Sequence, residues 1–348
     1  MPYSCSKKRE ELLDTVAGFS GASVLVIGDI ILDKYIWGKA ERISQEAPVV
    51  VVRVEEDSER LGGAGNVARN LSSLGAQVSI CTLIGRDDRG ERVISLLEQA
   101  KVCCDAVVSE DGRRTTVKSR VIANAQQVVR VDREDNFSAK QSSTDAMLDY
   151  VSANYDSFDA IVISDYAKGF LNSSSLGSLN CLLEEIPSAR KKPVVLDPKG
   201  PNFSNYANYT LVKPNRSEAE EASSKEIRGL EDAKEAAVAL LERWSCGMVL
   251  VTLGEDGMIL VSRLRGGLSA THIGTSARDV FDVSGAGDTV TAIFALGLAV
   301  GADPVDTAVL SNYGAGLVVA ELGTATVCAK QLKEAVLAVG ENWIYGSV

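Results

Sequence analysis

Histidine is almost absent from this sequence, in which His272 is the single one among 348 residues. Catalysis by a Ser-His-Asp or Cys-His arrangement would have to rest on that residue, and a site with several histidine ligands for a metal is excluded. His272 lies in an alternating segment that is typical of a strand, so an ordinary strand residue is the simpler interpretation. The sequence therefore points away from histidine chemistry.

Net positive charge and long apolar runs are also lacking. The formal net charge is −11, which disfavours nonspecific binding to nucleic acid or to an anionic membrane surface. No apolar run reaches the ~18 residues that a membrane-spanning helix needs, and the first twenty residues lack the apolar core of a signal peptide. We expect neither nucleic acid nor a membrane as a partner.

Cysteine is present, but not in metal-site spacing. The seven cysteines form no C-x-x-C pair, and Cys103 and Cys104 are adjacent. We interpret all seven as reduced thiols of a cytoplasmic protein.

Apolar runs that alternate with helical patterns indicate the fold class. The runs at 23–29, 158–165 and 192–197 are rich in Val, Ile and Leu, as buried parallel strands are. Such alternation predicts an α/β fold with a mainly parallel sheet and helices on both faces. Ligands of these folds gather at the carboxyl ends of the strands. There the three runs each end in an acid, namely Asp29, Asp165 and Asp197.

Two segments, 34–56 and 105–131, break this alternation. They read as short strands and turns without a long helix. We predict that they form a small accessory sheet, which is a lid over the site, a dimer surface, or both. The whole chain, 1–348, is then a single domain that carries a lid.

The stretch GGAGNVA begins at Gly62 and contains the dinucleotide-binding pattern G-x-G-x-x-A. It does not directly follow the first strand, and no acid ends a second strand about twenty residues later. A dehydrogenase is therefore disfavoured. Two interpretations stay open: glycines that allow tight helix packing, or a backbone that approaches a polar ligand, with Asn66 hydrogen-bonding it.

A second glycine-rich stretch, SGAGD, places Gly285 and Gly287 before Asp288 and a helical pattern. It lacks the Lys-Ser/Thr pair of a Walker loop. Asp288 could simply cap the helix. Alternatively, the N–H groups of Ala286, Gly287 and Asp288 form an anion hole beside a base, an arrangement that suits phosphoryl transfer. In that hypothesis Asp288 accepts the proton of the attacking hydroxyl, on the other side of the phosphorus from the N–H groups.

Taken together, Gly62–Gly85 and Asp282–Ala292 resemble the two signatures of the ribokinase-like (PfkB) sugar kinase family in order and spacing. The resemblance covers nearly the whole chain. It implies a parallel α/β domain with a β-sheet lid, and ATP-dependent phosphorylation of a sugar or nucleoside hydroxyl with Asp288 as catalytic base. It also implies Mg²⁺ as a cofactor and a homodimer joined through the lid, and leaves open whether a monovalent cation binds.

The resemblance extends to a nucleotide site. KPNRSE resembles the family's N-x-x-E motif, in which Asn215 and Glu218 position Mg²⁺ and phosphate through water, and VTLGEDG resembles the turn that borders the nucleotide. We assign two kinds of position to ATP and its metal. One is the strand-end Lys199, and the others match the family's nucleotide site: Asn215, Glu218, Thr252, Gly254, Gly257 and Asn312.

Finer features resemble the heptose-7-phosphate kinases of lipopolysaccharide precursor synthesis, among them NAQQVVRVDRE, SDYAKGFL and LDPKG. Those enzymes phosphorylate the anomeric hydroxyl of D-glycero-D-manno-heptose 7-phosphate on the way to ADP-heptose. Many are fused to a nucleotidyltransferase domain. Because this chain ends at Val348, we expect the stand-alone kinase, with the kinase domain of such a bifunctional protein as the alternative.

A phosphorylated sugar needs carboxylates for its hydroxyls and basic groups for its phosphate. Asp29 and Asp33 can each accept two hydroxyl groups, although a mere pair of loop acids is the alternative. The lid segments supply Arg113, Arg114, Lys118, Arg120 and Arg130, of which any single one could be a solvated surface charge. Strand alternation sends only one of Gln126 and Gln127 toward the site. The predicted acceptor site comprises Asp29, Asp33, Gly62, Gly63, Asn66, Arg120, Gln127, Arg130, Asp165 and Lys168.

Two alternative functions stay open. The acceptor could be a pentose, a ketohexose or its phosphate, or a nucleoside. A nucleoside would favour an aromatic stacking wall, yet only 5% of the chain is aromatic, and Tyr35 and Trp37 are the candidates in the first lid segment. A non-catalytic sugar-binding protein is disfavoured, because GAGD, Asn215 and Glu218 are all present.

Overall fold

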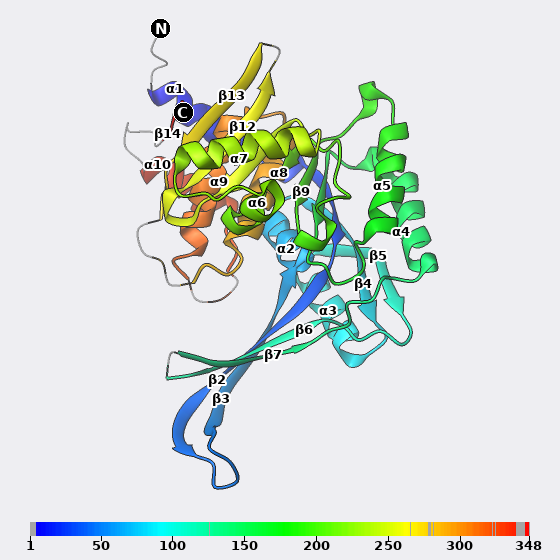
Figure 1. Cartoon of the computed structure of the whole chain (residues 1–348), viewed down its shortest axis with the longest axis vertical. Coiled ribbons are helices and arrows are strands. Elements are labelled where there is room, and N and C mark those ends of the chain that lie inside the picture. Colours follow the sequence, from blue (N-terminus) through cyan, green and yellow to red (C-terminus); the bar gives the residue numbers. More distant parts are fainter. Residues whose placement is uncertain are drawn as a thin grey trace.

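The computed structural model describes residues 5–124, 126–264, 266–277, 280, 282–321, 323, 325–338 and 345–347. Within these residues, the main sheet has ten strands in the order β14-β13-β12-β11-β10-β9-β8-β1-β4-β5 (Figure 1). Their bounds are β1 (Ser23–Gly28), β4 (Gln77–Gly85), β5 (Val102–Glu110), β8 (Ala160–Ser164), β9 (Val194–Asp197), β10 (Leu211–Val212), β11 (Met248–Thr252), β12 (Met258–Leu264), β13 (Gly267–Ile273) and β14 (Tyr345–Ser347).

The strands from β5 to β11 are mutually parallel, while β12, β13 and β14 add to the β11 edge in antiparallel pairs. The α/β fold with a mainly parallel sheet is thus confirmed. The parallel strands bring their carboxyl ends to one edge, where ligands bind in folds of this kind.

Helices cover both faces of the main sheet because its strands are buried on both sides. Val24 and Val26 of β1 belong to one apolar core, and Leu25 and Ile27 to the other. The first core is shared with α1 (Cys5–Gly18), α2 (Ala64–Ser73), α3 (Asp88–Gln99), α8 (Ala286–Ala299), α9 (Pro304–Val318) and α10 (Ala329–Ala338). The second is shared with α4 (Gln141–Asn154), α5 (Ser173–Glu185), α6 (Arg216–Ser223) and α7 (Leu230–Arg243). In the described part of the chain every helix is too short or too polar to span a membrane.

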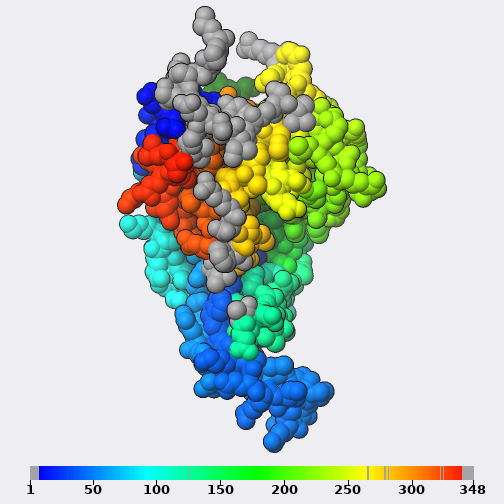
Figure 2. All heavy atoms as spheres, turned by 90° about the vertical axis from the view of Figure 1, so that its left-hand side faces the viewer, coloured from blue at the N-terminus to red at the C-terminus, as the bar shows by residue number. Residues whose placement is uncertain are grey.

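A second sheet, called the small sheet below, has the strand order β3-β2-β6-β7. It comprises β2 (Ile30–Ile43), β3 (Val50–Gly63), β6 (Val117–Ala123) and β7 (Gln126–Arg133). The β2–β3 hairpin projects from the body of the molecule (Figures 1 and 2). It is longer at both ends than the predicted lid segment 34–56.

The second predicted lid segment, 105–131, is wrong in its first part. Strand β5 runs to Glu110 and pairs with β4 in the main sheet, so the chain enters the small sheet only at Val117. The period of a strand's side chains indicates a strand but not the sheet that it joins, which explains the error.

Helix α8 is buried along most of its length, from Asp288 to Gly297. Its tight contact with α9 requires a glycine, because a Cβ atom on Gly297 would lie 2.3 Å from Cγ2 of Thr307. The SGAGD stretch therefore opens a helix whose position is fixed by packing.

We predict that Gly297→Ala lowers the thermal midpoint of unfolding, since overpacking a well-packed contact costs about 1–3 kcal/mol. The control is Gly177→Ala, on the exposed side of α5, where an added Cβ meets nothing within 4 Å. There the better helix propensity of Ala should stabilise the protein by about 0.5–1 kcal/mol. Differential scanning calorimetry measures both, and equal shifts would contradict the packing argument.

Candidate active site

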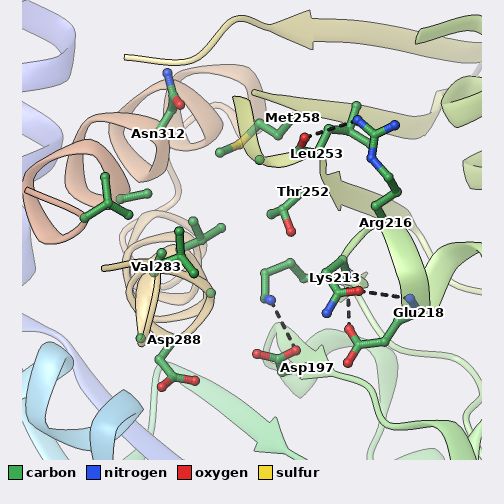
Figure 3. Close-up of a pocket in the computed structure, with 18 of the residues that line it drawn as sticks. Asp197, Lys213, Arg216, Glu218, Thr252, Leu253, Met258, Val283, Asp288 and Asn312 are labelled. Atoms are coloured by element: carbon green, nitrogen blue, oxygen red, sulfur yellow. Dashed lines mark hydrogen bonds and ion pairs between the residues drawn. The ribbon is translucent and has the colours of Figure 1, made fainter. Parts of the chain in front are cut away.

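A cavity of about 900 Å³ opens where the carboxyl ends of β8, β9 and β11 meet the start of α8 (Figure 3). All seven residues assigned to ATP and its metal line this cavity, as do Asp165 and residues 285–288. Asp288, Asp197 and Lys213 lie toward one end, and Leu253, Met258 and Asn312 toward the other (Figure 3). The cavity thus has a charged end and a largely apolar end.

The start of α8 is shaped by Gly285, which caps the helix with φ 85° in the left-handed region that glycine tolerates best. The N–H groups of a helix's first turn have no preceding helical acceptor. Of the three that were expected to form the anion hole, that of Ala286 donates to the carbonyl of Val283 at 3.3 Å. The backbone N–H groups of Gly287 and Asp288 are therefore the candidate donors at this helix start. A Cβ on Gly287 would lie 3.3 Å from Nζ of Lys213, so the ammonium group adds positive charge beside them.

The Asp288 carboxylate is held at both oxygens. The Tyr166 hydroxyl donates to Oδ1 at 2.7 Å, and Nδ2 of Asn66 donates to Oδ2 at 2.6 Å. Burial and the charge of Asp197 raise the pKa of Asp288 to about 6, against the opposing effects of Asn66, Tyr166 and Lys213. A carboxylate with this pKa is largely ionised at neutral pH yet more basic than an exposed one, as a general base requires.

The hydrogen bond between Asn66 and Asp288 joins the two glycine-rich stretches across 222 positions of sequence. A second contact follows one turn along, where Oγ1 of Thr289 donates to Oδ1 of Asn70 at 3.2 Å. Gly63 enters α2 with φ 57°, and a Cβ there would lie 2.5 Å from the carbonyl oxygen of Asp29. The glycine therefore has a conformational role and lets α2 begin directly after β3.

Lys213 and Asp197 form a buried ion pair of 3.1 Å next to Asp288. Burial acts to lower the pKa of Lys213, but Asp197 and Glu218 more than offset this and raise it, so the residue is a cation. Neither Lys213 nor Tyr166 has a role predicted from the sequence. The available signal was position, because each follows a buried strand closely at the ligand-binding edge.

The N-x-x-E motif has a structural role as well, since it forms a capping box at the start of α6. Oδ1 of Asn215 accepts from the N–H of Glu218 at 2.9 Å, and Oε2 of Glu218 accepts from the N–H of Asn215 at 3.0 Å. Oε1 of Glu218 accepts from Nζ of Lys199 at 2.7 Å. The reciprocal bonds fix both side chains at the cavity wall.

The charged end of the cavity fits Mg²⁺. Glu218 and Asp197 supply hard carboxylate oxygens, the ligands that this ion prefers. Among the described residues, no group of three His, Cys, Asp or Glu could hold a metal by itself. Mg²⁺ usually keeps several waters and is held by one or two carboxylates together with phosphate oxygens of its ligand.

The other end of the cavity is walled by apolar side chains: Leu253, Met258, Val280, Val283 and Val319. The turn after β11 is held by Arg216, which donates to the carbonyl of Leu253 at 3.2 Å and to Asp256. Gly257 (φ 80°) needs to be glycine, because a Cβ would lie 2.1 Å from the carbonyl oxygen of Ile273. Nδ2 of Asn312 donates to the carbonyl of Gly274 at 2.8 Å and so fixes the cavity rim. A ligand with a flat apolar ring and an anionic tail would match both ends.

Two acids that were predicted to bind the acceptor instead hold a loop. Both oxygens of Asp29 accept from backbone N–H groups, those of Tyr166, Lys168 and Phe170, at 3.0–3.1 Å. Burial raises the pKa of Asp29. Asp165 accepts from the Tyr206 hydroxyl, Nδ2 of Asn202 and the N–H of Ala167, and burial together with Asp29 raises its pKa to about 7. Asp165 still borders the cavity, whereas Asp29 does not.

The remaining predicted acceptor residues lie outside this cavity. Asp33 accepts from Arg120 at 2.5 Å, and its carboxylate lies against Gly62, where a Cβ would be 2.2 Å from Oδ2. Lys168 pairs with Glu134 at 2.8 Å. On the exposed edge strand β7 lie Gln127 and Arg130, the latter paired with Asp132.

A family model and several known proteins match this chain. The model of the family described as "pfkB family carbohydrate kinase" matches residues 22–331. The chain is 45% identical to the bifunctional protein HldE of Pelobacter propionicus over 90% of the chain and 63% of that protein. For the HldE of a Caulobacter species the identity is 44%, over 92% of the chain and 64% of that protein. The chain thus spans less than two thirds of the length of these relatives.

Solved structures show the same fold at low identity. Escherichia coli phosphofructokinase-2, in complex with substrates and products, matches with a TM-score of 0.75 at 18% identity, covering 91% of this chain and 98% of that one. Arabidopsis thaliana ribokinase, complexed with ribose and ATP, matches with a TM-score of 0.69 at 17% identity, covering 90% and 98%.

We predict that Tyr166→Phe shifts the pH profile of the reaction. The hydroxyl lowers the pKa of Asp288, so its loss should raise that pKa above 6 and move the acidic limb of kcat/KM to higher pH, by about one unit. The control is Tyr150→Phe, a half-buried tyrosine that hydrogen-bonds Ser79 outside the cavity. An unmoved acidic limb in Tyr166→Phe would contradict the role of the hydroxyl.

Proposed function

Because the chain belongs to the pfkB family of carbohydrate kinases, we propose that it transfers the γ-phosphoryl group of ATP to the anomeric hydroxyl of D-glycero-β-D-manno-heptose 7-phosphate. The product is the 1,7-bisphosphate, a precursor of ADP-heptose and of the lipopolysaccharide core. The observation that carries the proposal is a buried carboxylate at a helix start, Asp288, with a pKa of about 6, beside a cavity with a charged and an apolar end.

In the proposed mechanism, Asp288 accepts the proton of the anomeric hydroxyl as that oxygen attacks the γ-phosphorus. Asn66 and Tyr166 keep the carboxylate in one orientation. The N–H groups at the start of α8 and the Lys213 ammonium stabilise the negative charge on the transferring phosphoryl group.

The nucleotide is proposed to lie along the cavity, with adenine at the apolar wall and the phosphates toward Lys213 and Lys199. Glu218 and Asn215 would hold Mg²⁺ through water, as predicted, with Asp197 as an additional oxygen donor nearby. Mg²⁺ would supply neutralisation of the phosphate charge. A monovalent cation is a further candidate ligand, since the similar phosphofructokinase-2 has been solved in complex with potassium.

The choice of acceptor rests on the sequence features that resemble heptose-7-phosphate kinases and on the 41–45% identity to HldE proteins. A pentose, a ketohexose or a nucleoside as acceptor is the alternative. Non-catalytic sugar binding would leave the charge cluster around Asp288 without a purpose. The single domain and the cytoplasmic location stay predictions from the sequence.

The test of the function is a coupled ADP-release assay with Mg-ATP and a panel of acceptors: heptose 7-phosphate, sedoheptulose 7-phosphate, fructose 6-phosphate, ribose, fructose and adenosine. Heptose 7-phosphate should give the highest kcat/KM. Asp288→Asn should lower kcat about 10²- to 10⁴-fold, the usual contribution of a general base. Preference for an unphosphorylated sugar or for adenosine would refute the acceptor, and near-normal turnover of Asp288→Asn would refute the base.

The thermal stability of the Asp288→Asn variant can also be predicted. Because the folded state raises the pKa of Asp288 from 3.8 to about 6, ionisation of this residue costs stability as pH rises through that window. Asparagine can still accept from Asn66 and donate to the Tyr166 oxygen. The thermal midpoint of Asp288→Asn at pH 8 should therefore be no lower than that of the wild type, which separates lost chemistry from lost folding.

We further propose that the chain forms a homodimer through the small sheet. Strands β3 and β7 are its edges, and exposed edges favour pairing with another copy. Val54, Val129 and Val131 on these strands are 47–57% exposed. Light scattering should give the mass of a dimer at micromolar concentration, and Val129→Lys with Val131→Lys should weaken it. Leu264→Lys, on the 60% exposed Leu264 of β12, is the control, and a wild-type monomer would refute the proposal.

A further inference from the structure

One face of the small sheet carries a cluster of arginines close to Asp288. Arg60 of β3 pairs with Asp33 of β2, and Arg120 of β6 pairs with Tyr35 of the same β2. Directly paired residues of adjacent strands lie on the same face, and so do residues two apart on one strand. Asp33, Tyr35, Arg60 and Arg120 therefore share one face.

The buried ring of Tyr35 brings two of the arginines together. The guanidinium carbon of Arg60 lies 5.6 Å from the ring centroid and that of Arg120 lies 5.3 Å from it. Tyr35 itself is only 3% exposed. Contacts of this length are within the range of cation–π attraction, so the ring fixes both cations at the base of the small sheet.

A third cation joins from α2. Arg69 donates through Nη2 to Oδ1 of Asn66 at 3.2 Å. Burial, and after it the nearby charge of Arg60, lower the pKa of Arg69. Arg69 is therefore held at the amide that contacts Asp288.

Of these arginines, Arg69 is separated from Asp288 by a single amide group. The Asn66 side chain accepts from Arg69 at one end and donates to Asp288 at the other. Arg60 also lies near the segment that leads into α8. A Cβ on Gly323 would lie 2.8 Å from Nη1 of Arg60, and the N–H of Gly323 donates to Oδ2 of Asp282, four residues before α8, at 3.0 Å. An acceptor whose reacting hydroxyl lies at Asp288 would therefore extend toward these arginines.

The other basic residues expected near the acceptor also have protein partners, as Arg120 has in Asp33. The Arg113 guanidinium donates to Glu110 and to the carbonyls of Lys168 and Phe137. The remaining basic side chains each pair with an acid: Arg114 with Asp135, Lys118 and Arg130 with Asp132, and Lys168 with Glu134.

We propose that Arg60, Arg69 and Arg120 bind the phosphate group that the acceptor sugar already carries, at the end opposite to the reacting hydroxyl. The inference rests on the proposed function and deepens it by naming the residues that select a phosphorylated sugar. Guanidinium groups suit a phosphate dianion because they donate paired hydrogen bonds to its oxygens. Asp33, held by Arg120, is placed to accept a sugar hydroxyl beside that phosphate.

The test compares Arg60→Gln and Arg69→Gln with the wild type, using heptose 7-phosphate and the same heptose without its phosphate. Each variant should raise KM for the phosphorylated sugar about 10-fold or more, the effect of losing a charge-assisted hydrogen bond. In Arg60→Gln the kcat/KM for the unphosphorylated sugar should stay within about twofold, since that sugar has no group for the cluster. Arg69→Gln also removes a donor to Asn66, so this variant is judged by the difference in affinity between the two sugars. Arg120 is left intact because its loss would also release Asp33.

Titration calorimetry without ATP provides a readout that does not depend on catalysis. Wild type should bind heptose 7-phosphate more tightly than the unphosphorylated heptose, and each variant should lose that difference. Arg263→Gln, which removes an exposed charge paired with Glu242 on β12, is the control for net charge. Thermal midpoints confirm that the variants fold.

Each outcome decides one of the two proposals. Equal losses on both sugars, unchanged affinity in both variants, or a wild type that binds the two sugars equally well would overturn the phosphate site. Tight binding of the phosphorylated sugar that depends on Arg60 and Arg69, without its phosphorylation, would leave the phosphate site standing and refute the proposed reaction.

Discussion

The hydrogen bond between Asn66 and Asp288 is the contact on which the rest of the site depends. It holds together the starts of α2 and α8, two helices that lie 222 residues apart at this point in the sequence. Both helices begin at glycines whose backbone is in the positive φ region. A Cβ on Gly63 would lie 2.5 Å from the carbonyl oxygen of Asp29, so a larger residue there would shift the start of α2, on which Asn66 lies.

The partners of Asp288 also explain its pKa. A direct ion pair with a lysine would lower the pKa of a buried aspartate strongly. Here Lys213 pairs with Asp197, and Asp288 receives only neutral donors, from Asn66 and Tyr166. Burial therefore keeps its pKa raised at about 6. The same lysine remains near enough to Gly287 to favour an anion at the helix start. One arrangement thus gives a base and a cation side by side without their neutralising each other.

The sequence was sufficient for the mainly parallel sheet and for a set of residues that the structure brings together around one cavity, because strand patterns and short motifs are local. It was insufficient where a role depends on distant partners. Asp29 and Asp165 look like free strand-end acids, yet their oxygens are occupied by backbone N–H groups and by Tyr206 and Asn202. Tyr166 has no motif of its own, and its contact spans 122 positions. The N-x-x-E spacing fits a capping box as well as a metal motif, and the structure shows the capping box.

Strand β3 ends at Gly63 and α2 begins at Ala64, with no loop between them. The projecting hairpin is thus directly continuous with the first turn of α2, where Asn66 lies. Residues 43–50 at the tip are thus joined to the amide that touches Asp288 by one strand and the first turn of one helix. Any contact made at the hairpin is therefore continuous, through the backbone, with the helix start that carries Asn66.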